Sequence, residues 1–343
     1  MNARELVIHA LLGAPVSRYP CGPLAVHYTA ALSRVSLREY TQNPDTLADC
    51  VTRYYESFRP DAVWVSADTW VTAEAMGAEV GFPGPEQPMS GTGRRLVRTA
   101  ADIDKIPPAG AVLPGRCVLM CKALSRVKKR LGKEVFCVGC FDQSPFSLAC
   151  ALMGAEPLMM RAIEDPPFVE ALLERCVDYA EAYAVAMARA GADMLSTGDS
   201  MAGLIGRPLY QRFAIPAQRT LFERIRGRCD ALLSLHICGN AVHILDEMAA
   251  SGCDVLEIDA RTDMERCIQI VSPAIALWGN IDPVTVLDEG TPEQVRQEAL
   301  RILRLMKEHG RTRFVLSSGC TLTPGTPAEN LHALIETARD FGV

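Results

Sequence analysis

Eight short apolar runs, separated by longer amphipathic segments, are the feature of this sequence that most constrains its fold. Short runs rich in β-branched residues are typical of buried strands, and the segments between them show helical spacing. The expected strands are Pro23–His27, Ala62–Ala67, Val135–Phe141, Met194–Thr197, Leu232–Ile237, Val255–Ile258, Ile275–Trp278 and Phe314–Ser317. This alternation predicts an α/β fold whose strands close into a parallel (β/α)8 TIM barrel. A doubly wound open sheet is the alternative.

Helix punctuation supports the alternation. A long helix is expected over residues 166–189, with Asp165 as its N-cap. The stretch Thr291–Gln294 has the capping-box pattern with Pro at the first helical position, and it opens a helix that ends before Gly310. The stretch Thr326–Glu329 repeats this pattern ahead of the last expected helix.

Two stretches interrupt the alternation. Residues 80–116 are rich in Gly and Pro, and we expect a long insertion over the barrel mouth, a position suited to a lid. Residues 1–20 are expected to form an N-terminal helix or arm. Hydrophobic residues make up 49% of the 343 residues, and no internal repeat or inter-domain linker is found. Residues 1–343 are therefore expected to form one barrel-sized domain.

The stretch Leu235–Asn240 is the strongest candidate for a chemical site. It ends an expected strand, and side chains two residues apart on a strand share a face. His236 and Cys238 therefore point the same way where the strand reaches a glycine turn. A nitrogen and a sulfur directed at one point suit a zinc ion. The alternative is a buried, hydrogen-bonded histidine beside a small buried cysteine.

Other strand ends supply the missing ligands. A barrel places its chemistry at the carboxyl ends of its strands, and Cys320 lies just past the last one. His236, Cys238 and Cys320 would leave one zinc position open for a substrate. Four residues are candidates for a resting fourth ligand or for hydrogen-bond partners of the ligands: Glu257, Asp259, Asp199 and Asn240. His243 is assigned a structural or supporting role.

The chemistry of such a zinc site follows from its charge. Two thiolates and one imidazole cancel the charge of the ion, so it is a weak Lewis acid toward carbonyl groups. Zinc still holds a substrate thiol as the thiolate, which is the nucleophilic form. The set therefore favours alkyl transfer to sulfur over hydrolysis.

Composition excludes several classes of protein. The formal net charge is −6 and no block of Lys or Arg suggests nucleic-acid binding. No apolar run reaches the roughly 18 residues of a membrane span, and residues 1–14 do not resemble a secretory signal, so a cytoplasmic protein is expected. The 13 cysteines are then expected to be thiols. Cys137 and Cys140 form C-x-x-C within a strand-like run, and we interpret them as structural, with thiol redox chemistry as the alternative.

Several motifs together resemble one family. The motifs are Asp68–Gly77, Leu235–Asn240, Gly279–Pro283 (G-N-I-D-P), Ser317–Cys320 and Pro324–Asn330. In this combination, from about Asp61 onward, the chain resembles the uroporphyrinogen decarboxylase superfamily. Within it, the H-x-C and G-C motifs are similar to those of the corrinoid-dependent methyltransferases that act on coenzyme M or related acceptors.

The resemblance implies a β/α barrel and a zinc ion bound by His236, Cys238 and Cys320. It implies that an acceptor thiol takes a methyl group from methyl-Co(III) corrinoid (methylcobalamin) and leaves Co(I). No D-x-H-x-x-G corrinoid motif is found in the sequence, so the corrinoid is expected on a separate carrier protein. The acceptor is coenzyme M, another thiol or tetrahydrofolate. Asp68 matches the aspartate of the superfamily and would orient the donor or the acceptor.

Two alternatives remain. One is a metal-independent decarboxylase in which Asp68 is central. The segment Tyr19–His27, which corresponds to the arginine-rich carboxylate grip of the decarboxylases, holds no arginine, although Arg18 lies just before it. The other is an accessory protein that binds zinc or corrinoid without catalysis.

Overall fold

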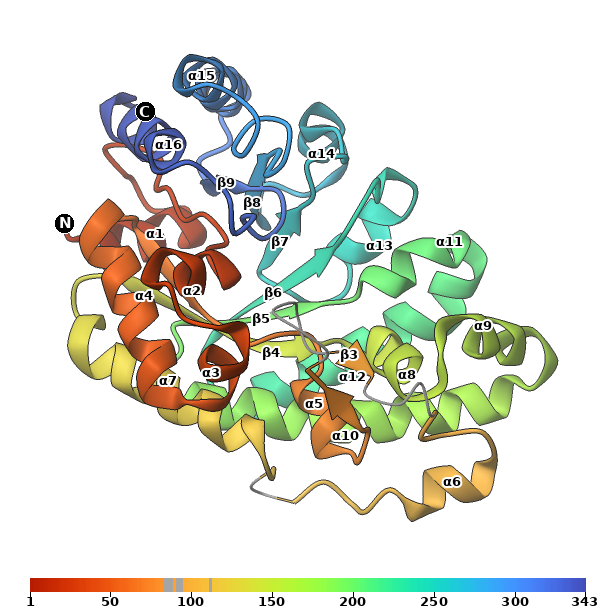
Figure 1. Ribbon diagram of the computed structural model, residues 1–343. Coiled ribbons are helices and arrows are strands. Elements are labelled where there is room, and N and C mark those ends of the chain that lie inside the picture. Colours follow the sequence, from red (N-terminus) through yellow and green to blue (C-terminus); the bar gives the residue numbers. More distant parts are fainter. Residues whose placement is uncertain (83–88, 91–94, 111–112) are drawn as a thin grey trace.

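Seven parallel strands form a curled sheet at the centre of the molecule (Figure 1). The structure is a computed structural model, and it describes residues 1–82, 89–90, 95–110 and 113–343. The strand order is β1-β4-β5-β6-β7-β8-β9, so each strand pairs with the strand of this sheet that follows it in the sequence. The strands are β1 (Ala62–Val65), β4 (Phe136–Gln143), β5 (Met194–Gly198), β6 (Leu232–Ile237), β7 (Val255–Ile258), β8 (Ala276–Ile281) and β9 (Phe314–Ser318). This order confirms the predicted α/β barrel architecture.

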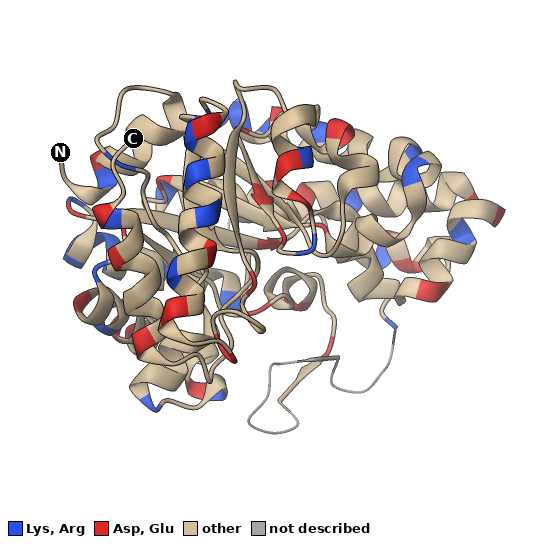
Figure 2. Ribbon diagram, turned by 90° about the horizontal axis from the view of Figure 1, so that it is seen from above, with Lys and Arg blue, Asp and Glu red and all other residues tan. Residues whose placement is uncertain are grey.

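Helices cover the outside of the sheet, and shorter helical segments lie at its two ends (Figure 1). The outer helices are α4 (Pro44–Phe58), α7 (Arg116–Leu131), α10 (Pro166–Arg189), α12 (Ile215–Arg226), α13 (Leu245–Ala249), α14 (Met264–Ile270), α15 (Pro292–Glu308) and α16 (Ala328–Asp340). The other helical segments are α1 (Ala3–Leu12), α2 (His27–Ser33), α3 (Leu37–Gln42), α5 (Val71–Ala75), α6 (Ala100–Lys105), α8 (Pro145–Met153), α9 (Ala155–Glu164), η1 (Ser200–Leu204), α11 (Gly206–Leu209), η2 (Tyr210–Ala214) and η3 (Val242–Ile244). Lys and Arg are interspersed with Asp and Glu on the helices seen in Figure 2.

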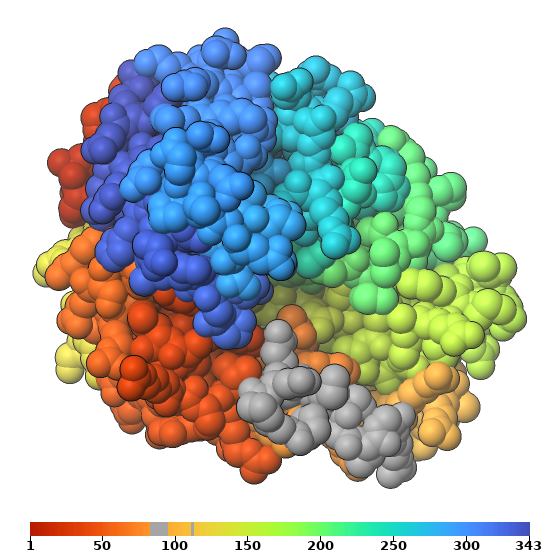
Figure 3. Space-filling view, turned by 45° about the horizontal axis from the view of Figure 1, so that its top comes forward, coloured from red at the N-terminus to blue at the C-terminus, as the bar shows by residue number. Residues whose placement is uncertain are grey.

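The expected strand Pro23–His27 is wrong. His27 begins α2, and Pro23 and the residues after it pair with no strand. Residues 20–22, just before the expected strand, lie between β9 and β1 and take the eighth place in the ring. Residues 20–22 exchange two main-chain hydrogen bonds with Leu316 of β9, both 2.9 Å long, and the Cys21 carbonyl accepts a bond of 2.8 Å from the Asp61 N–H ahead of β1. On the face seen in Figure 3, N-terminal residues (red) lie beside C-terminal ones (dark blue).

The long helix α10 and the capping box of α15 confirm the helix predictions. Asp165 caps α10 through the Phe168 N–H, and Thr291 and Gln294 cap each other at α15. The expected cap at Thr326 is wrong, because α16 begins at Ala328 with Pro327 as its N-cap. The Thr326 hydroxyl instead donates to the Thr323 carbonyl at 3.0 Å, a local turn bond that competes with capping.

The insertion predicted over residues 80–116 is described in part. Residues 83–88, 91–94 and 111–112 lie outside the described residues. The rest includes the short antiparallel pair β2 (Val80–Gly81) and β3 (Met89–Ser90), as well as α6. Its position over the barrel mouth stays a prediction.

Helix α1 plugs the amino-terminal end of the barrel. Its first turn lies at the beginning of two strands, where the Arg4 N–H donates to the Glu134 carbonyl and the Arg4 guanidinium pairs with Asp193 at 2.9 Å. Val7 and Leu11 pack into a cluster inside the sheet with residues that include Trp64 and Trp278, whose rings meet edge to face. The carboxyl ends of the strands are therefore left as the end where a ligand can enter.

The plug predicts a stability effect. Replacing Leu11, which is 3% exposed, by Ala is expected to lower the free energy of unfolding by about 2–5 kcal/mol, because it leaves a cavity in this cluster. Leu12 is the matched control, because it is 54% exposed and its replacement by Ala should change the free energy by less than about 0.5 kcal/mol. Urea denaturation measures both. Equal losses would contradict the packing of α1.

Among the described residues, no single helix is long and apolar enough to cross a membrane. The α8–α9 pair meets the length and composition test together, but it is bent by 108°.

Candidate active site

A cavity of about 210 Å³ lies at the carboxyl ends of the strands. It is lined by residues of β1, β4, β5, β6 and β7, by Cys320 just after β9, and by the Leu24–His27 stretch. Trp64 and Leu24 belong to the barrel cluster and give the cavity an apolar floor. The cavity therefore occupies the place where β/α barrels carry their chemistry.

Four potential metal ligands converge beside this cavity. One ligand atom each of His236, Cys238, Asp259 and Cys320 lies within 4.8 Å of the others. The His236 Nε2 and Cys238 Sγ atoms are 3.1 Å apart. Two sulfurs at about 2.3 Å from one tetrahedral zinc ion lie roughly 3.7 Å apart, so these spacings fit one such ion after small adjustments. The structure thus brings together the three sequence-predicted ligands and one of the four proposed additional residues.

Hydrogen bonding fixes the orientation of the His236 ring. Its Nδ1 lies 3.0 Å from the main-chain oxygen of Glu257, and a carbonyl only accepts, so Nδ1 carries the proton. In the neutral ring Nε2 is then unprotonated and faces Cys238 and Cys320. This carbonyl–imidazole pair is the usual support of a metal-binding histidine.

The two sulfurs perturb each other's titration. The hydrogen bond with Cys320, aided by the Ser200 hydroxyl 3.0 Å away, lowers the pKa of Cys238 to about 7. The same contact, together with burial, raises the pKa of Cys320 to about 12. The pair therefore favours one thiolate and one thiol, and a cation between them would favour two thiolates.

Glycine and asparagine residues make this convergence possible. A Cβ atom on Gly319 would lie 2.3 Å from the Ala260 nitrogen, so only glycine lets the end of β9 approach the turn after β7 this closely. Cys320 and Asp259 are brought together as a result. Asn280 holds the same turn, because its side-chain amide donates to the Asp259 and Thr262 carbonyls at 3.1 and 2.9 Å.

The other residues proposed as a fourth ligand have different partners. Glu257 lies beneath His236 and accepts hydrogen bonds from the Ser196 and Ser234 hydroxyls. Asp199 is fully buried and accepts from the Ser147 N–H and from the Gln218 amide. Burial raises the pKa of Asp199 to about 6. The Asn240 side-chain oxygen accepts from the Val242 N–H at 3.2 Å. None of these three is in the converging set.

Asp68 lines the cavity, but both of its oxygens already have partners. One accepts from the Trp70 N–H at 2.8 Å, and the other is ion-paired with Arg116. Arg116 also binds Glu74 through its Nε at 2.6 Å, and its guanidinium lies against the Phe82 ring. The Asp68 side chain therefore lines the cavity in a fixed orientation, paired with Arg116.

Asp142 is a cavity residue that the sequence reasoning missed. It follows the expected strand Val135–Phe141 directly, so its position at a strand end is the signal that was available. Its Oδ2 accepts from the Thr72 N–H at 2.9 Å, whereas its Oδ1 is buried without a partner among the described residues. Burial, assisted by the charge of Asp68, raises the pKa of Asp142 to about 8.

This pKa predicts a pH-dependent difference in stability. The native Asp142 holds its proton up to about pH 8, whereas the unfolded residue loses it near pH 4. The native state binds more protons between these values, so Asp142 costs stability progressively as the pH rises. Asp142→Asn, which keeps the shape and cannot ionise, should gain stability relative to the wild type from pH 5 to pH 8. Denaturation across this range measures the difference, and a constant difference would contradict the prediction.

The C-x-x-C pair is divided between two environments. Cys137 is fully buried in the outer core, whereas Cys140 lines the cavity. Burial raises the pKa of each thiol to about 12, so neither meets the condition set for redox chemistry, a depressed pKa.

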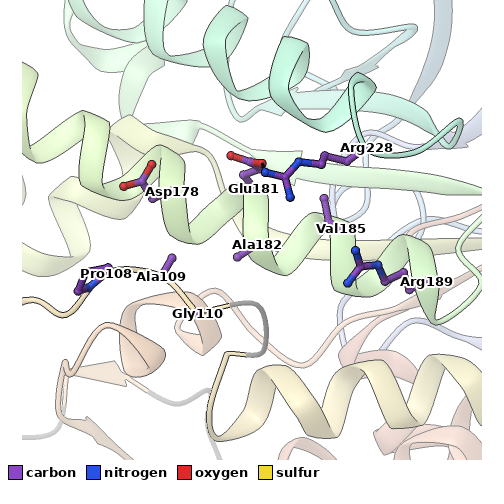
Figure 4. A pocket seen from close by; sticks show the side chains of 9 residues that line it. All are labelled: Pro108, Ala109, Gly110, Asp178, Glu181, Ala182, Val185, Arg189 and Arg228. Carbon is purple, nitrogen blue, oxygen red and sulfur yellow. Dashed lines mark ion pairs between the residues drawn. The ribbon is translucent and has the colours of Figure 1, made fainter.

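A second cavity, of about 340 Å³, lies on the helical outside of the barrel between α10 and residues 108–110 (Figure 4). Its acidic side chains are already paired: Asp178 with Arg224 at 2.8 Å, and Glu181 with Arg228 at 3.3 Å. No group of metal ligands converges there within the described chain. The smaller cavity at the strand ends is therefore the better candidate for chemistry.

Comparison with known proteins adds independent information. The family profile described as Uroporphyrinogen decarboxylase (URO-D) matches residues 2–341. The methylcobamide:CoM methyltransferase of Methanosarcina acetivorans is 28% identical over 345 residues, which covers 98% of both chains. A uroporphyrinogen decarboxylase of Gloeobacter violaceus is 25% identical over 351 residues and also covers 98% of both. A solved methyltransferase from Methanosarcina mazei superposes with a TM-score of 0.88 at 24% identity and covers 99% of both chains, which shows a shared fold.

Proposed function

The chain belongs to the uroporphyrinogen decarboxylase family, and within this family we propose that it is a zinc-dependent methyltransferase. In this proposal a methyl group moves from a methyl-corrinoid on a separate carrier protein to a small acceptor, most simply a thiol. The observation that carries the proposal is the convergence of His236, Cys238, Cys320 and Asp259 beside the cavity. The similarity to a methylcobamide:CoM methyltransferase supports it.

The donor set fits zinc. Two sulfurs, one imidazole nitrogen and one carboxylate oxygen are all zinc ligands, and thiolates select zinc over Mg²⁺ or Ca²⁺. Asp259 is the member best placed to give way to an acceptor, because its Oδ1 has an alternative partner in the Arg261 N–H at 2.8 Å. When bound, the metal would lower the pKa of an acceptor thiol and keep it as a thiolate.

The chain's own residues would position and protect the acceptor. The Glu257 carbonyl orients His236, the Ser200 hydroxyl supports Cys238, and the apolar floor excludes water from the reacting sulfur. The methyl-corrinoid would supply the methyl group: the acceptor sulfur would form a bond to the methyl carbon, and the electron pair of the broken cobalt–carbon bond would stay with the donor. The thiol proton leaves to solvent. In well-oriented intramolecular reactions, alignment of the reacting atoms accounts for up to about 7–11 kcal/mol of the activation barrier.

A decarboxylase function has less support from the site. Arg18, the arginine nearest the segment that corresponds to the carboxylate grip, forms two hydrogen bonds of 2.7 Å with Asp61, just ahead of β1. It therefore lies at the opposite end of the barrel from the cavity. Among the described residues that line the cavity there is no Lys or Arg to bind a substrate with many carboxylates.

Zinc analysis and a transfer assay test the proposal together. Protein purified without chelator is expected to hold about one zinc ion per chain and to methylate a small thiol with free methylcobalamin, which is followed by the cobalamin spectrum. Tetrahydrofolate is included as a second acceptor. Full transfer by zinc-free protein would exclude the mechanism. Zinc binding without transfer to any acceptor would favour an accessory protein.

A further inference from the structure

The charges around the cavity select among acceptors. The described lining residues include three carboxyl groups, those of Asp68, Asp142 and Glu257, and no Lys or Arg. His27 is held by the Ala67 carbonyl at 2.6 Å, and burial lowers its pKa, so it adds no positive charge at neutral pH. The converging ligands would neutralise a zinc ion. The described cavity therefore offers no positive group for a sulfonate or carboxylate of an acceptor.

Asp142 lines this cavity, and one of its two side-chain oxygens is buried without a hydrogen-bond partner among the described residues. The Thr72 N–H holds its Oδ2, and the Thr197 hydroxyl donates to its main-chain oxygen at 3.1 Å. Its backbone has a φ of 76°, where the pairing of β4 with β5 is irregular. Asp is among the few residues that tolerate this conformation. Asp142 is 5% exposed, and its buried Oδ1 has no partner within the described part of the chain.

The neighbours of Asp142 leave this oxygen to a ligand. The charged groups that act on its pKa are Asp68 and Arg116, which bind each other, although the Nη2 atom of Arg116 is also buried without a partner in the described part of the chain. Arg116 also binds Glu74, and it is not a lining residue of the cavity. The remaining titratable neighbours are Cys140, Cys117 and Tyr183, whose pKa values burial raises, so they are neutral at pH 7.

We propose that the acceptor is a small thiol with an ammonium group at its far end, and that Asp142 binds this ammonium. The inference rests on the proposed methyl transfer for the thiol end. His236 on β6 pairs with Gly198 on β5, and Gly198 pairs with Gln143 on β4, the neighbour of Asp142. The zinc ligand His236 and Asp142 are therefore about two strand spacings apart, roughly 10 Å between Cα atoms. The side chains of His236 and Asp142 both line the cavity. Its volume of about 210 Å³ is smaller than the roughly 300–1,000 Å³ of sites for drug-sized ligands, so it suits a small acceptor.

Binding of the ammonium requires Asp142 to lose its proton. The carboxyl of the free protein is protonated at pH 7, and an adjacent cation favours the carboxylate. The proton leaves to solvent as the ion pair forms. An ammonium thiol should therefore release about one more proton at pH 7 than an uncharged thiol of equal length. A sulfonate thiol would instead need Asp142 to keep its proton.

Three thiols of equal length test the inference on zinc-loaded protein. They are cysteamine, 2-mercaptoethanol and 2-mercaptoethanesulfonate, which end in a cation, a neutral hydroxyl and an anion. Calorimetry in buffers of different ionisation enthalpy gives the affinity and the number of protons released. We expect cysteamine to bind at least about tenfold more tightly than the sulfonate, as charge-assisted hydrogen bonds require. Its extra proton release relative to 2-mercaptoethanol should disappear in Asp142→Asn.

The binding data test the ammonium site at Asp142, and the transfer assay tests the proposed methyl transfer. Preference for the sulfonate, or equal binding of all three thiols by the wild-type protein, would overturn the ammonium inference while methyl transfer still supports the proposed function. Preferential binding of cysteamine without methylation of any thiol would overturn the transfer mechanism and keep the ammonium site. If none of the three thiols binds, the inference is wrong. The wild-type comparison needs no variant, so a folding defect of Asp142→Asn cannot obscure the result.

Discussion

Replacing Cys238 by Ala is expected to remove both zinc and methyl transfer. The variant loses one of two sulfurs in the converging set, and the remaining Cys320 sulfur keeps only His236 of its two hydrogen-bond partners. Zinc content should fall from about one ion per chain to near zero. The rate of transfer from methylcobalamin should fall beyond the roughly 10–100-fold that is typical when only a supporting partner of a ligand is replaced. Elemental analysis and the cobalamin spectrum measure the two effects.

Cys229→Ala is the matched control for this variant. It removes the same thiol group from the loop after α12, outside the cavity and the converging set, where the Cys229 sulfur donates to the Ile225 carbonyl. Zinc content and transfer should both remain at the wild-type level. A Cys238→Ala protein that keeps its zinc and its activity would show that His236, Cys320 and Asp259 do not need the second sulfur, and the proposed centre would be wrong.

Replacing Arg116 by Met is expected to cause a large loss of stability. The Arg116 side chain is 5% exposed and that of its partner Asp68 is fully buried, so the variant leaves a buried carboxylate without its cation. Loss of one partner from a buried pair costs about 3–5 kcal/mol of unfolding free energy. Urea denaturation measures it. The double variant Arg116→Met with Asp68→Asn should recover part of this loss, because no buried charge is then unpaired.

The exposed pair of Arg130 and Asp49 provides the comparison. Their side chains are 40% and 65% exposed, and such pairs contribute at most about 1 kcal/mol. Arg130→Met should therefore change the unfolding free energy by less than this amount. Equal losses at positions 116 and 130 would contradict the buried ionic arrangement around Asp68.

The fold followed from periodicity because strands and helices differ in their apolar spacing. Seven of the eight expected strands lie in the sheet, and the capping box of α15 begins its helix as predicted. The error at Pro23–His27 has a physical cause. The residues of this run are apolar because their side chains are buried inside the barrel. Leu24 and Val26 pack into the interior cluster, although the run does not pair with the sheet. Composition does not distinguish such a run from a strand.

The site was only partly accessible from the sequence. His236 and Cys238 share a strand face, so their juxtaposition follows from a local rule. The approach of Cys320 to Asp259 depends on the contact between Gly319 and Ala260, which no local pattern encodes. The partner of Asp68 was not accessible at all, because Arg116 opens a helix 48 positions later. Long-range ion pairs depend on the whole topology.

The junction between β9 and β1 has a consequence for association between molecules. Without a neighbour, β1 and β9 would each have unpaired main-chain N–H and C=O groups along one edge, to which a strand of another chain could bind. A closed ring of strands has no such edge. Here residues 20–22 occupy that place, held by three main-chain bonds and by Asp61, whose carboxylate also accepts from the Cys21 N–H at 2.8 Å. Arg18 fixes this carboxylate in turn. The Arg18–Asp61 contact therefore helps to hold the segment that covers the edges of β1 and β9, where a strand of another chain could otherwise pair.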